Sequence, residues 1–536
     1  MNHYLRILVI SVFVTFCACS GGSSAIEEEQ LELSEALQQK FSALDKLVYG
    51  NDTLMAGSAV LTYYKEKNFV PLWIRKDSLT EAGFELLNFI ENARDYGLLP
   101  EMYHYSTLSK MVDSSLADAE MMLSNAFFLF TTHLSVGCVD STSRQYVWKK
   151  DSLDFSISEQ IEKVRSGTKV AEIVSAVQPD FWEYKQLQQG LTSFLDQYPL
   201  DTNHYVIPAF KEDSVICYQA AREALLGHAF LDSTEASNDS IFLEKLKIFQ
   251  TFNGLTSDAV VGKWTGKALE KSNLDRFYQA ALSLEKWRWR DPFPGKYIRV
   301  NIPEFALYFV EDGKTLRKHR VVVGAYDTPT PEFRDTMKYM VTNPFWSVPF
   351  SIASTEILYA ARKDTTSTYF DKRGYKVFDN QGAVIDPKVV DWSTIKESNF
   401  GGYRIRQDAG GGNSLGRIKF LFPNPHAVYI HDSPAKNLFG NDVRAYSHGC
   451  IRLHQPYELA KEMLRSDVSS LAPDSLEGVI GRGIQRTIEL NEPFEVFIEY
   501  YTASADSNAS IRFHPDIYGR DAKFVNNTFK KFNPFN

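Results

Sequence analysis

The chain has 536 residues, of which 44% are hydrophobic, 13% aromatic and 23% charged. This length is too great for one core and predicts about two to four domains, with ample apolar material for each. The net charge of −9 argues against a nucleic-acid binder and against bulk electrostatic attraction as a means of recognising a polyanion.

The N-terminal residues have the pattern of an export signal. Arg6 precedes an apolar run of about a dozen residues, too short for a permanent membrane span but suited to a signal-peptide core. Cys17-Ala18-Cys19 and the small residues after it resemble the lipobox of bacterial lipoproteins, although Phe16 stands where Leu is usual. The resemblance predicts a signal peptide over 1–18 and an acylated Cys19. Ordinary secretion is the alternative, and both place the mature protein outside the cytoplasm.

A linker over 19–40, acidic and helical in pattern, and a helical domain over 41–235 are predicted next. Thr80 stands in the position of a helix N-cap, and apolar residues recur at helical spacing over 121–134 and 184–195. The domain contains no catalytic constellation, so its aromatic residues are expected to form core.

Residues 236–275 predict a small helical module. A helix over 242–250 leads to Asn253-Gly254-Leu255, and Gly262 precedes a second helix over 263–269. This order resembles small three-helix peptidoglycan-binding modules. A structural hairpin, or a degenerate module that no longer binds glycan, is the alternative.

From residue 297 the hydrophobic pattern changes to period two, which is typical of strands. Five strands fit it: 297–302, 306–310, 318–323, 494–501 and 511–513. Residues 311–314 predict a turn between the second and the third. We therefore predict a mostly β domain over 295–525, a sandwich or barrel-like sheet, followed by a tail over 526–536. The whole chain is predicted to be an α+β multidomain protein.

The most informative pattern is Tyr429-Ile430-His431-Asp432, a gap of fourteen residues, and Ser447-His448-Gly449-Cys450-Ile451-Arg452. A thiol is a good nucleophile only as thiolate, so Cys450 needs an imidazole to take its proton and backbone N–H groups to hold an oxyanion. Gly449 lets the main chain approach a substrate without a Cβ in the way. These are the parts of a cysteine acyl-transfer site.

Local structure supports this interpretation. A strand is predicted over 427–430, delivering His431 at its end, and a helix over 457–464 with Pro456 suited to its first position. The segment around Cys450 therefore lies at a junction between elements, where exposed catalytic groups tend to occur.

This ordered pattern resembles the signature of the L,D-transpeptidases (YkuD-type catalytic domain) of bacterial cell walls. The resemblance extends to Pro329-Thr330-Pro331, 343–349 and 415–420, and is closest to the large multidomain members of Gram-negative bacteria. In that family the cysteine is the nucleophile, the histidine at the strand end is the general base, and the histidine of the H-G-C run lies beside the oxyanion hole. The resemblance implies catalytic roles for Cys450, His431, His448 and Gly449.

The resemblance also covers other parts of the chain. The helical domain, with turns at Pro71 and Gly97, resembles the scaffold domain that precedes the catalytic domain in these enzymes. Residues 351–403 match the insertion that forms a lid, in which a helix is predicted over 356–363. Glycine runs at 401–402 and 410–412 are candidate hinges or plain tight loops, and they lack the context of a phosphate loop.

Substrate contacts are predicted around the nucleophile. Arg452 follows Cys450 by two residues, so in strand-like geometry both side chains face one side, and the guanidinium is a candidate partner for a stem-peptide carboxylate. A structural arginine, paired with Asp432 or a loop carbonyl, is the equal alternative. The other candidate substrate-binding residues are Arg444, Ser447, Tyr429 and Trp346.

The implied reaction is a two-step acyl transfer on peptidoglycan stem peptides. A donor tetrapeptide forms a thioester, and the side-chain amine of an acceptor diamino acid then attacks it to give a 3-3 cross-link. Water as acceptor would make the protein an L,D-carboxypeptidase, and a protein amine would make it a wall-attachment enzyme. The implied location is the periplasm, with membrane attachment through Cys19. We predict no nucleic-acid partner and no cofactor.

Two other interpretations compete with this one. His431, His448, Cys450 and His454 are types that zinc accepts, but no H-E-x-x-H motif supplies a placed base, so no metal is predicted. A non-enzymatic wall-anchoring lipoprotein would need no pairing of His431 with Cys450. Of the five cysteines, Cys138 and Cys217 remain without a role, as a disulfide or two buried thiols.

Overall fold

The computed structural model describes residues 22–43, 48–49, 52–139, 156–364, 366, 368–467 and 471–532. The predicted signal peptide and Cys19 lie outside these residues. The chain divides into two compact units: a first unit of 1–94, 99–135 and 153–178, and a second unit of 95–98, 136–152 and 179–536. The predicted α+β multidomain class is confirmed, with a helical N-terminal part and a C-terminal part built on a sheet. None of the helices in the described ranges is both long enough and apolar enough to cross a bilayer.

The first unit is mainly helical. Its helices are α1 (Gly22–Ala43), α2 (Gly57–Glu66), α3 (Glu81–Glu91), α4 (Tyr105–Met111), α5 (Leu116–Val136), α6 (Ile157–Arg165) and α7 (Val170–Ala176). Its short strands are β1 (Val48–Tyr49), β2 (Asp52–Thr53), β3 (Ile74–Arg75) and β4 (Ser78–Leu79). Thr80 caps α3 as predicted, accepting from the Gly83 N–H at 3.1 Å. Glu120, fully buried on α5, accepts from the backbone N–H groups of 72–74 and so fixes the turn after Pro71.

The second unit begins with the helices α8 (Trp182–Gln197), α9 (Ser214–Gly227), α10 (Asp239–Phe252), α11 (Lys263–Leu269) and α12 (Asn273–Arg288). The predicted helical domain over 41–235 included α8, but α8 groups with the second unit, because Gly190 lets it approach Ala509 and Ile511 closely. A Cβ at Gly190 would lie 2.7 Å from the carbonyl oxygen of Ala509. Helices α9 to α11 enclose a small core of their own.

A nine-stranded sheet forms the centre of the second unit. Its strands are β5 (Lys296–Asn301), β6 (Ala306–Glu311), β7 (Lys314–Gly324), β8 (Phe333–Thr342), β13 (Ile418–Leu421), β14 (Ile430–His431), β15 (Ala445–Ser447), β16 (Ile451–Leu453) and β17 (Arg486–Glu499). Their order is β15-β7-β16-β14-β13-β8-β17-β5-β6, and β6 also pairs with β7. That last pairing closes the sheet, so the barrel-like alternative of the prediction is the one observed. The predicted turn at 311–314 joins β6 to β7, with Asp312 and Gly313 at positive φ.

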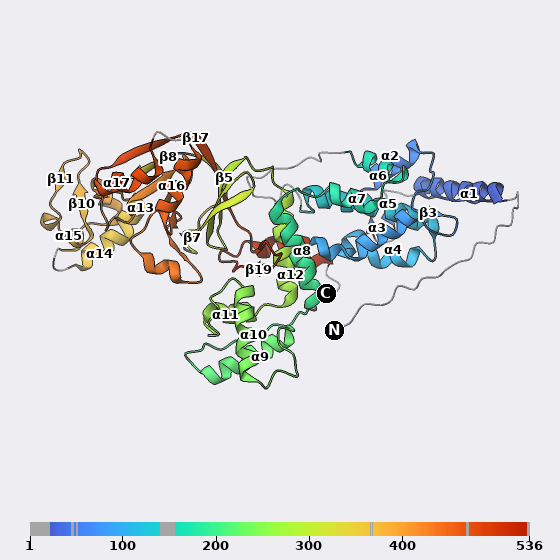
Figure 1. Ribbon diagram of the computed structural model, residues 1–536, viewed down its shortest axis with the longest axis horizontal. Helices are drawn as coiled ribbons and strands as arrows, with labels where there is room; N and C mark the ends of the chain where they lie inside the picture. The colour runs from blue at the N-terminus through green and yellow to red at the C-terminus, as the bar shows by residue number, and fades with distance from the viewer. Residues whose placement is uncertain are drawn as a thin grey trace. The chain divides into compact units, whose positions relative to one another are not determined.

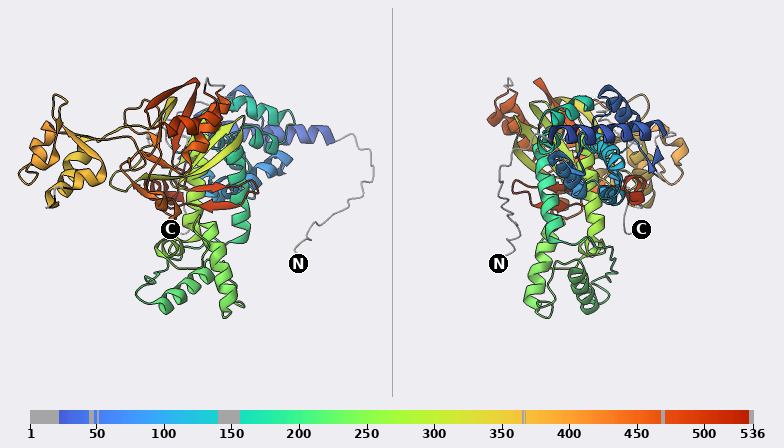
Figure 2. Two further views of the ribbon diagram at one scale, coloured as in Figure 1. Left: turned by 60° about the vertical axis from the view of Figure 1, so that its left-hand side comes forward. Right: turned by 90° about the vertical axis from the view of Figure 1, so that its right-hand side faces the viewer.

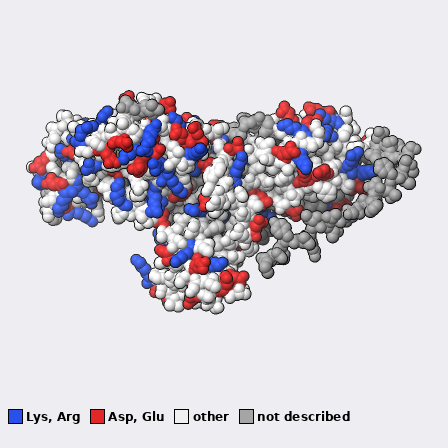
Figure 3. Space-filling model, in the orientation of Figure 1, with Lys and Arg blue, Asp and Glu red and all other residues white. Residues whose placement is uncertain are grey.

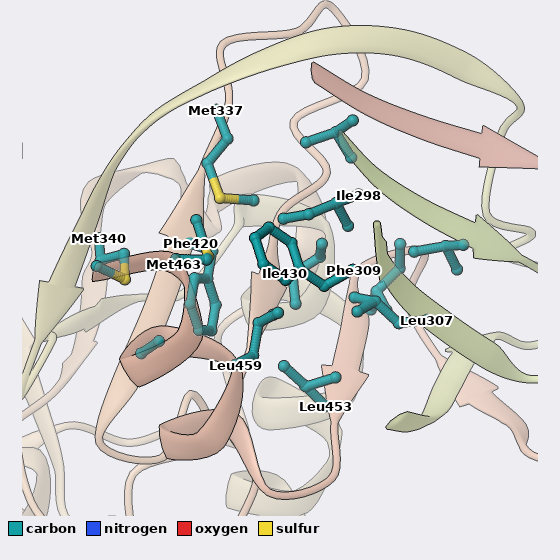
Figure 4. Packing of buried hydrophobic residues seen from close by; sticks show 14 of the residues in the cluster. Ile298, Leu307, Phe309, Met337, Met340, Phe420, Ile430, Leu453, Leu459 and Met463 are labelled. Atoms are coloured by element: carbon teal, nitrogen blue, oxygen red, sulfur yellow. The ribbon is translucent and has the colours of Figure 1, made fainter. Parts of the chain in front are cut away.

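The barrel is filled by apolar side chains that alternate along its strands. Figure 4 shows Ile298, Phe309, Phe420 and Ile430 pointing toward one another, with Leu459 closing the core from α16 (Pro456–Ser466). Helix α16 begins at Pro456, as predicted. Because successive residues of a strand face opposite sides, the neighbours of these core residues lie on the outer surface of the barrel.

The predicted lid is a small subdomain with its own core. Its strands β9 (Trp346–Ser347), β10 (Tyr375–Phe378), β11 (Val384–Ile385) and β12 (Arg404–Gln407) form a sheet in the order β11-β10-β12-β9. Its helical segments are α13 (Phe350–Ile352), η5 (Ala353–Ile357), α14 (Leu358–Lys363) and α15 (Tyr369–Arg373), so the helix predicted over 356–363 begins earlier. Ile357, Phe370 and Phe400 are among its buried core residues. Figures 1 and 2 show the lid projecting from the barrel within the second unit.

The remaining elements follow the barrel helix α16. They are α17 (Leu476–Gly481), the hairpin of β18 (Ala503–Ala505) and β19 (Ile511–Phe513), and α18 (Asp521–Thr528). Figure 3 shows acidic and basic side chains mixed over the visible face of the described residues. This mixture agrees with the conclusion that bulk charge is not the means of recognition.

Candidate active site

The two halves of the motif meet on adjacent strands. β14 and β16 pair in parallel, with Ile430 opposite Ile451 and His431 opposite Arg452. Ile430 and Ile451 point into the barrel core. The alternation of side chains then places Tyr429, His431, Cys450 and Arg452 on the outer face. The predicted strand over 427–430 is shorter than expected, because Ala427 adopts a left-handed φ of 53° and only Ile430–His431 pair.

The loop that carries the nucleophile is fixed by hydroxyl groups. Gly449 has φ 104°, a conformation that favours glycine, and the contact nearest to an added Cβ would be an ordinary 3.8 Å. The hydroxyl of Ser447 donates to the Cys450 carbonyl at 2.5 Å and accepts from the Gly449 N–H at 3.2 Å. Ser447 is buried, so its hydroxyl holds the loop, an arrangement that differs from the predicted contact with substrate.

Cys450 is half-buried beside Tyr429. Its sulfur lies 3.7 Å from the Ala427 carbonyl oxygen, and burial raises the pKa of the thiol above its ordinary value. Hydrogen bonding with Tyr429 and the charge of Arg452 oppose this shift in pKa. Tyr429 also interacts with Trp346, so these two predicted apolar walls meet next to the sulfur. The resting thiol is therefore neutral, and its predicted role as a nucleophile needs a base.

His431 is placed to be that base. Its Nδ1 lies 2.5 Å from the carbonyl oxygen of Asp432, which only accepts, so Nδ1 carries the proton and Nε2 has the free lone pair. Burial lowers the pKa of His431 to about 4, and the charge of Arg452 adds to this effect. The imidazole is thus neutral near pH 7. No hydrogen bond joins it to Cys450 within the described ranges, and such bonds often tighten only when substrate is present.

The carboxylate of Asp432 is engaged elsewhere. It accepts from Lys436 at 2.5 Å and from the backbone N–H groups of Arg417 and Ser433 at 2.9 and 2.7 Å. Gly416, at φ 60°, leaves room for this carboxylate, because an added Cβ would lie 2.2 Å from its Oδ2. The alternative in which Asp432 pairs with Arg452 is therefore not observed.

The two candidate arginines differ sharply. Arg452 is half-buried on the same face as Cys450, and among the described residues no hydrogen bond or ion pair engages its guanidinium. Burial lowers its pKa, with the sulfur of Cys450 opposing. Arg444 donates to the backbone carbonyls of Val321, Asn441, Asp442 and Phe305. Arg444 thus stabilises its loop, and the contact with substrate stays a prediction.

Two residues that sequence reasoning did not place in the site contact the loop. Thr330, fully buried, donates to the Gly449 carbonyl at 2.8 Å, and its position within Pro329-Thr330-Pro331 was the available signal. Glu356 of the lid bonds the exposed ring of His448 through Nε2. No local pattern marks Glu356, because the contact joins residues 92 positions apart. His448 therefore touches the lid rather than the sulfur.

The backbone N–H of Cys450 is available as a hydrogen-bond donor. Over the described part of the chain, no carbonyl or side chain accepts from the backbone N–H of Cys450. A backbone N–H at the nucleophile itself is the usual donor to the oxyanion of an acyl transfer. The described residues contain no group of three or more His, Cys, Asp or Glu side chains arranged for a metal ion. Cys138 and Cys217 are free thiols.

Comparison with known families identifies two domains. Residues 295–470 match the model of the L,D-transpeptidase catalytic domain, and residues 58–191 match that of a scaffold domain. A protein of Haemophilus influenzae named "Putative L,D-transpeptidase" is 34% identical over 224 residues, covering 42% of this chain and 44% of that protein. The chain therefore spans less than half the length of this relative.

Two solved structures match parts of this chain. An "Ldtfm-avibactam carbamoyl enzyme" matches 39% of this chain and 49% of its own, with 14% identity and a TM-score of 0.19. An L,D-transpeptidase from Mycobacterium smegmatis matches 38% of this chain and 58% of its own, with 13% identity and a TM-score of 0.17. TM-scores this low carry no conclusion about the reaction.

Proposed function

We propose that this chain, which contains an L,D-transpeptidase catalytic domain and a scaffold domain, forms 3-3 cross-links in peptidoglycan through a cysteine acyl-enzyme. The observation that carries the proposal is the pairing of β14 with β16, which puts neutral His431 and the thiol of Cys450 on one outer face. Arg452 lies on the same face without a hydrogen-bond partner in the described residues. A base, a nucleophile and a carboxylate binder are thus adjacent.

The first step acylates the enzyme. Nε2 of His431 takes the thiol proton while the sulfur of Cys450 attacks the carbonyl between the third residue of a donor tetrapeptide and its terminal D-Ala. The N–H of Cys450 holds the oxyanion, and losing such a donor typically costs about two to three orders of magnitude in rate. The intermediate collapses, His431 returns the proton to the leaving amine, and D-Ala departs from the thioester.

The second step transfers the acyl group. The side-chain amine of an acceptor diamino acid attacks the thioester, His431 takes its proton, and the thiol of Cys450 is restored as the amide forms. Water or a protein amine would use the same machinery and would give a carboxypeptidase or a wall-attachment enzyme. We propose the stem amine as the acceptor. The chemical identity of the product distinguishes it from water and from a protein amine.

The proposal includes location. The signal-like N-terminus and its lipobox-like Cys19 support export to the periplasm and attachment to a membrane through lipid. Labelling of expressing cells with a fatty-acid analogue should modify the wild type and spare Cys19→Ser. Export of a protein without the fatty-acid label would support ordinary secretion and would contradict the lipid anchor on Cys19.

The deciding experiment uses the purified chain with a disaccharide tetrapeptide, read by mass spectrometry. The expected product is a 3-3 linked dimer with release of D-Ala, and Cys450→Ala should give none while melting at the wild-type temperature. A tripeptide alone would indicate hydrolysis. Turnover by Cys450→Ala would overturn the proposal.

A further inference from the structure

A second pocket lies on the outside of the barrel, away from the nucleophile. Between β14 and β5 stand β13, β8 and β17 in one direction and β16, β7 and β6 in the other, so the two strands are on opposite sides of the closed barrel. The pocket has a volume of about 360 Å³ and lies against β5 and β6. Its other walls come from the start of α8, from α12 and from the β18–β19 hairpin. All of these elements belong to the second unit.

Arg299 forms the floor of this pocket and lacks hydrogen-bond partners. Its side chain is 9% exposed, and its guanidinium lies between the rings of Trp287 and Tyr308, 5.4 and 4.9 Å from their centroids. The carboxylates of Glu183 and Glu499 approach only to 3.7 and 3.8 Å, beyond hydrogen-bond distance. Within the described residues no acceptor takes a hydrogen bond from the guanidinium, and its Nε is fully buried. The buried Nε faces Oε2 of Glu499, which also lacks a hydrogen bond. The two Nη atoms are not fully enclosed and have no hydrogen-bond partner in the described residues, so these are the donors that a ligand can take.

The charge around Arg299 indicates the nature of that ligand. Glu183 and Glu499 already balance the guanidinium, and Glu304 is paired with Lys318 at 2.8 Å. A second anion at Arg299 would meet two carboxylates beside one guanidinium. The other cations of the lining, Lys318 and Arg512, are already paired with Glu304 and Asp506. A neutral acceptor, such as an amide carbonyl or a hydroxyl, can take the donors of Arg299 without this repulsion.

Trp182 supplies an apolar face at the same pocket. It begins α8, lines the pocket and is 51% exposed, an unusual state for so large an aromatic side chain. A flat exposed ring next to convergent polar groups suits a ligand with one apolar face and a polar edge. A sugar ring with an N-acetyl group has both, together with a neutral carbonyl for Arg299.

We propose that this pocket binds a neutral N-acetylated aminosugar, through stacking on Trp182 and hydrogen bonds from Arg299. That the sugar belongs to a glycan strand rests on the proposed function. That the ligand is a neutral aminosugar rests on the residues of the pocket. A site opposite the nucleophile would hold a strand on the barrel while its stem peptide reaches Cys450.

The test is calorimetric titration of the full chain with tetra-N-acetylchitotetraose. The wild type is expected to bind at millimolar concentration or better, and Trp182→Ala to weaken binding by about tenfold or more. Arg299→Lys should weaken it too, with melting checked because Arg299 is buried. Trp264→Ala is the matched control, since this tryptophan lies on α11 in the peptidoglycan-binding-like module and outside the pocket.

Three results would each overturn the inference: no binding by the wild type, unchanged affinity in Trp182→Ala, or tighter binding of an oligomer of acidic sugars. Loss of affinity in Trp264→Ala alone would move the sugar to the module and equally exclude this pocket. Acylation by a carbapenem is followed in parallel. Its absence from a wild type that binds sugar would defeat only the proposed function, and sugar binding that fails in an acylating wild type would defeat only this inference.

Discussion

Thr330 holds the peptide group that joins Gly449 to Cys450. Its hydroxyl donates to the Gly449 carbonyl at 2.8 Å and accepts from the Gly324 N–H at 2.9 Å. In a trans peptide the C=O and the following N–H point in opposite directions. The bond to Thr330 therefore turns the N–H of Cys450 away from Thr330, as an oxyanion donor requires.

Replacing Thr330 should impair acylation through this peptide. In Thr330→Val the Gly449 carbonyl and the Gly324 N–H both lose a buried partner, which costs about 1–3 kcal/mol for each group. We expect the acylation rate with a carbapenem to fall by about two orders of magnitude. Thr330→Ser keeps the hydroxyl and should retain most of the rate. Equal acylation rates in Thr330→Val and Thr330→Ser would show that the hydroxyl of Thr330 does not orient the oxyanion donor.

The pH dependence of acylation should show a neutral thiol and a neutral imidazole. Because the pKa of His431 is lowered to about 4 and that of Cys450 is raised, both are uncharged near pH 7. The acid limb of the rate profile should lie near pH 4, and the ultraviolet thiolate band should be absent at pH 7. A thiolate band at pH 7 that disappears in Cys450→Ala would show a preformed ion pair instead.

The pH dependence of the free energy of unfolding should reflect the lowered pKa of His431. Between pH 4 and pH 6.5, His431 is protonated in the unfolded chain but neutral in the folded protein, so unfolding takes up a proton in this range. The contribution of His431 to the free energy of unfolding is complete above the pKa that this residue has in the unfolded chain, and it is lost as the pH falls. Chemical denaturation of wild type and His431→Gln should show a steeper loss for the wild type on acidification. Parallel curves would contradict the lowered pKa.

Arg452→Lys and Arg444→Lys should have opposite effects. Lysine cannot reproduce a bidentate bond to a carboxylate, so Arg452→Lys should reduce kcat/KM for a tetrapeptide by about ten- to a hundredfold at an unchanged melting temperature. Arg444→Lys loses bonds to several backbone carbonyls and should melt earlier while keeping its KM. A loss of stability and activity in step for Arg452→Lys would make that residue part of the scaffold.

The bond between Glu356 and His448 should restrain the lid. An exposed pair contributes about 0–1 kcal/mol to stability, so Glu356→Ala should barely change the melting temperature. Hydrogen exchange, followed by mass spectrometry, should nevertheless become faster in the lid helix over 350–363. Glu397→Ala is the control, because Glu397 is exposed on the same lid and has no ion pair among the described residues. Identical exchange in the two variants would contradict the restraint.

Local patterns predicted the elements of the fold better than the way they group. The turn at 311–314, the cap at Thr80 and the start of α16 depend on a few neighbouring residues, and all three are observed. The pairings of β17 with β5 and of β16 with β7, and the grouping of α8 with the second unit, depend on distant contacts. No periodicity in the sequence contains that information.

The site shows the same division. Residue types and spacing predicted Cys450 and His431 together, and the pairing of β14 with β16 brings them onto one face. Orientation does not follow: Arg444 and Ser447 looked suitable for substrate, yet their donors are used by nearby carbonyl groups. Thr330 and Glu356 reach the loop from 119 and 92 residues away.

The lid leaves and re-enters the barrel domain at one place. Trp346 on β9 pairs with Gln407 on β12, so the first and last strands of the lid are antiparallel neighbours. The lid has its own core, and its two ends lie side by side. A short turn could therefore replace the lid without moving the residues on either side of it. The lid could thus be removed or exchanged as one piece, with the barrel and the loop around Cys450 left in place.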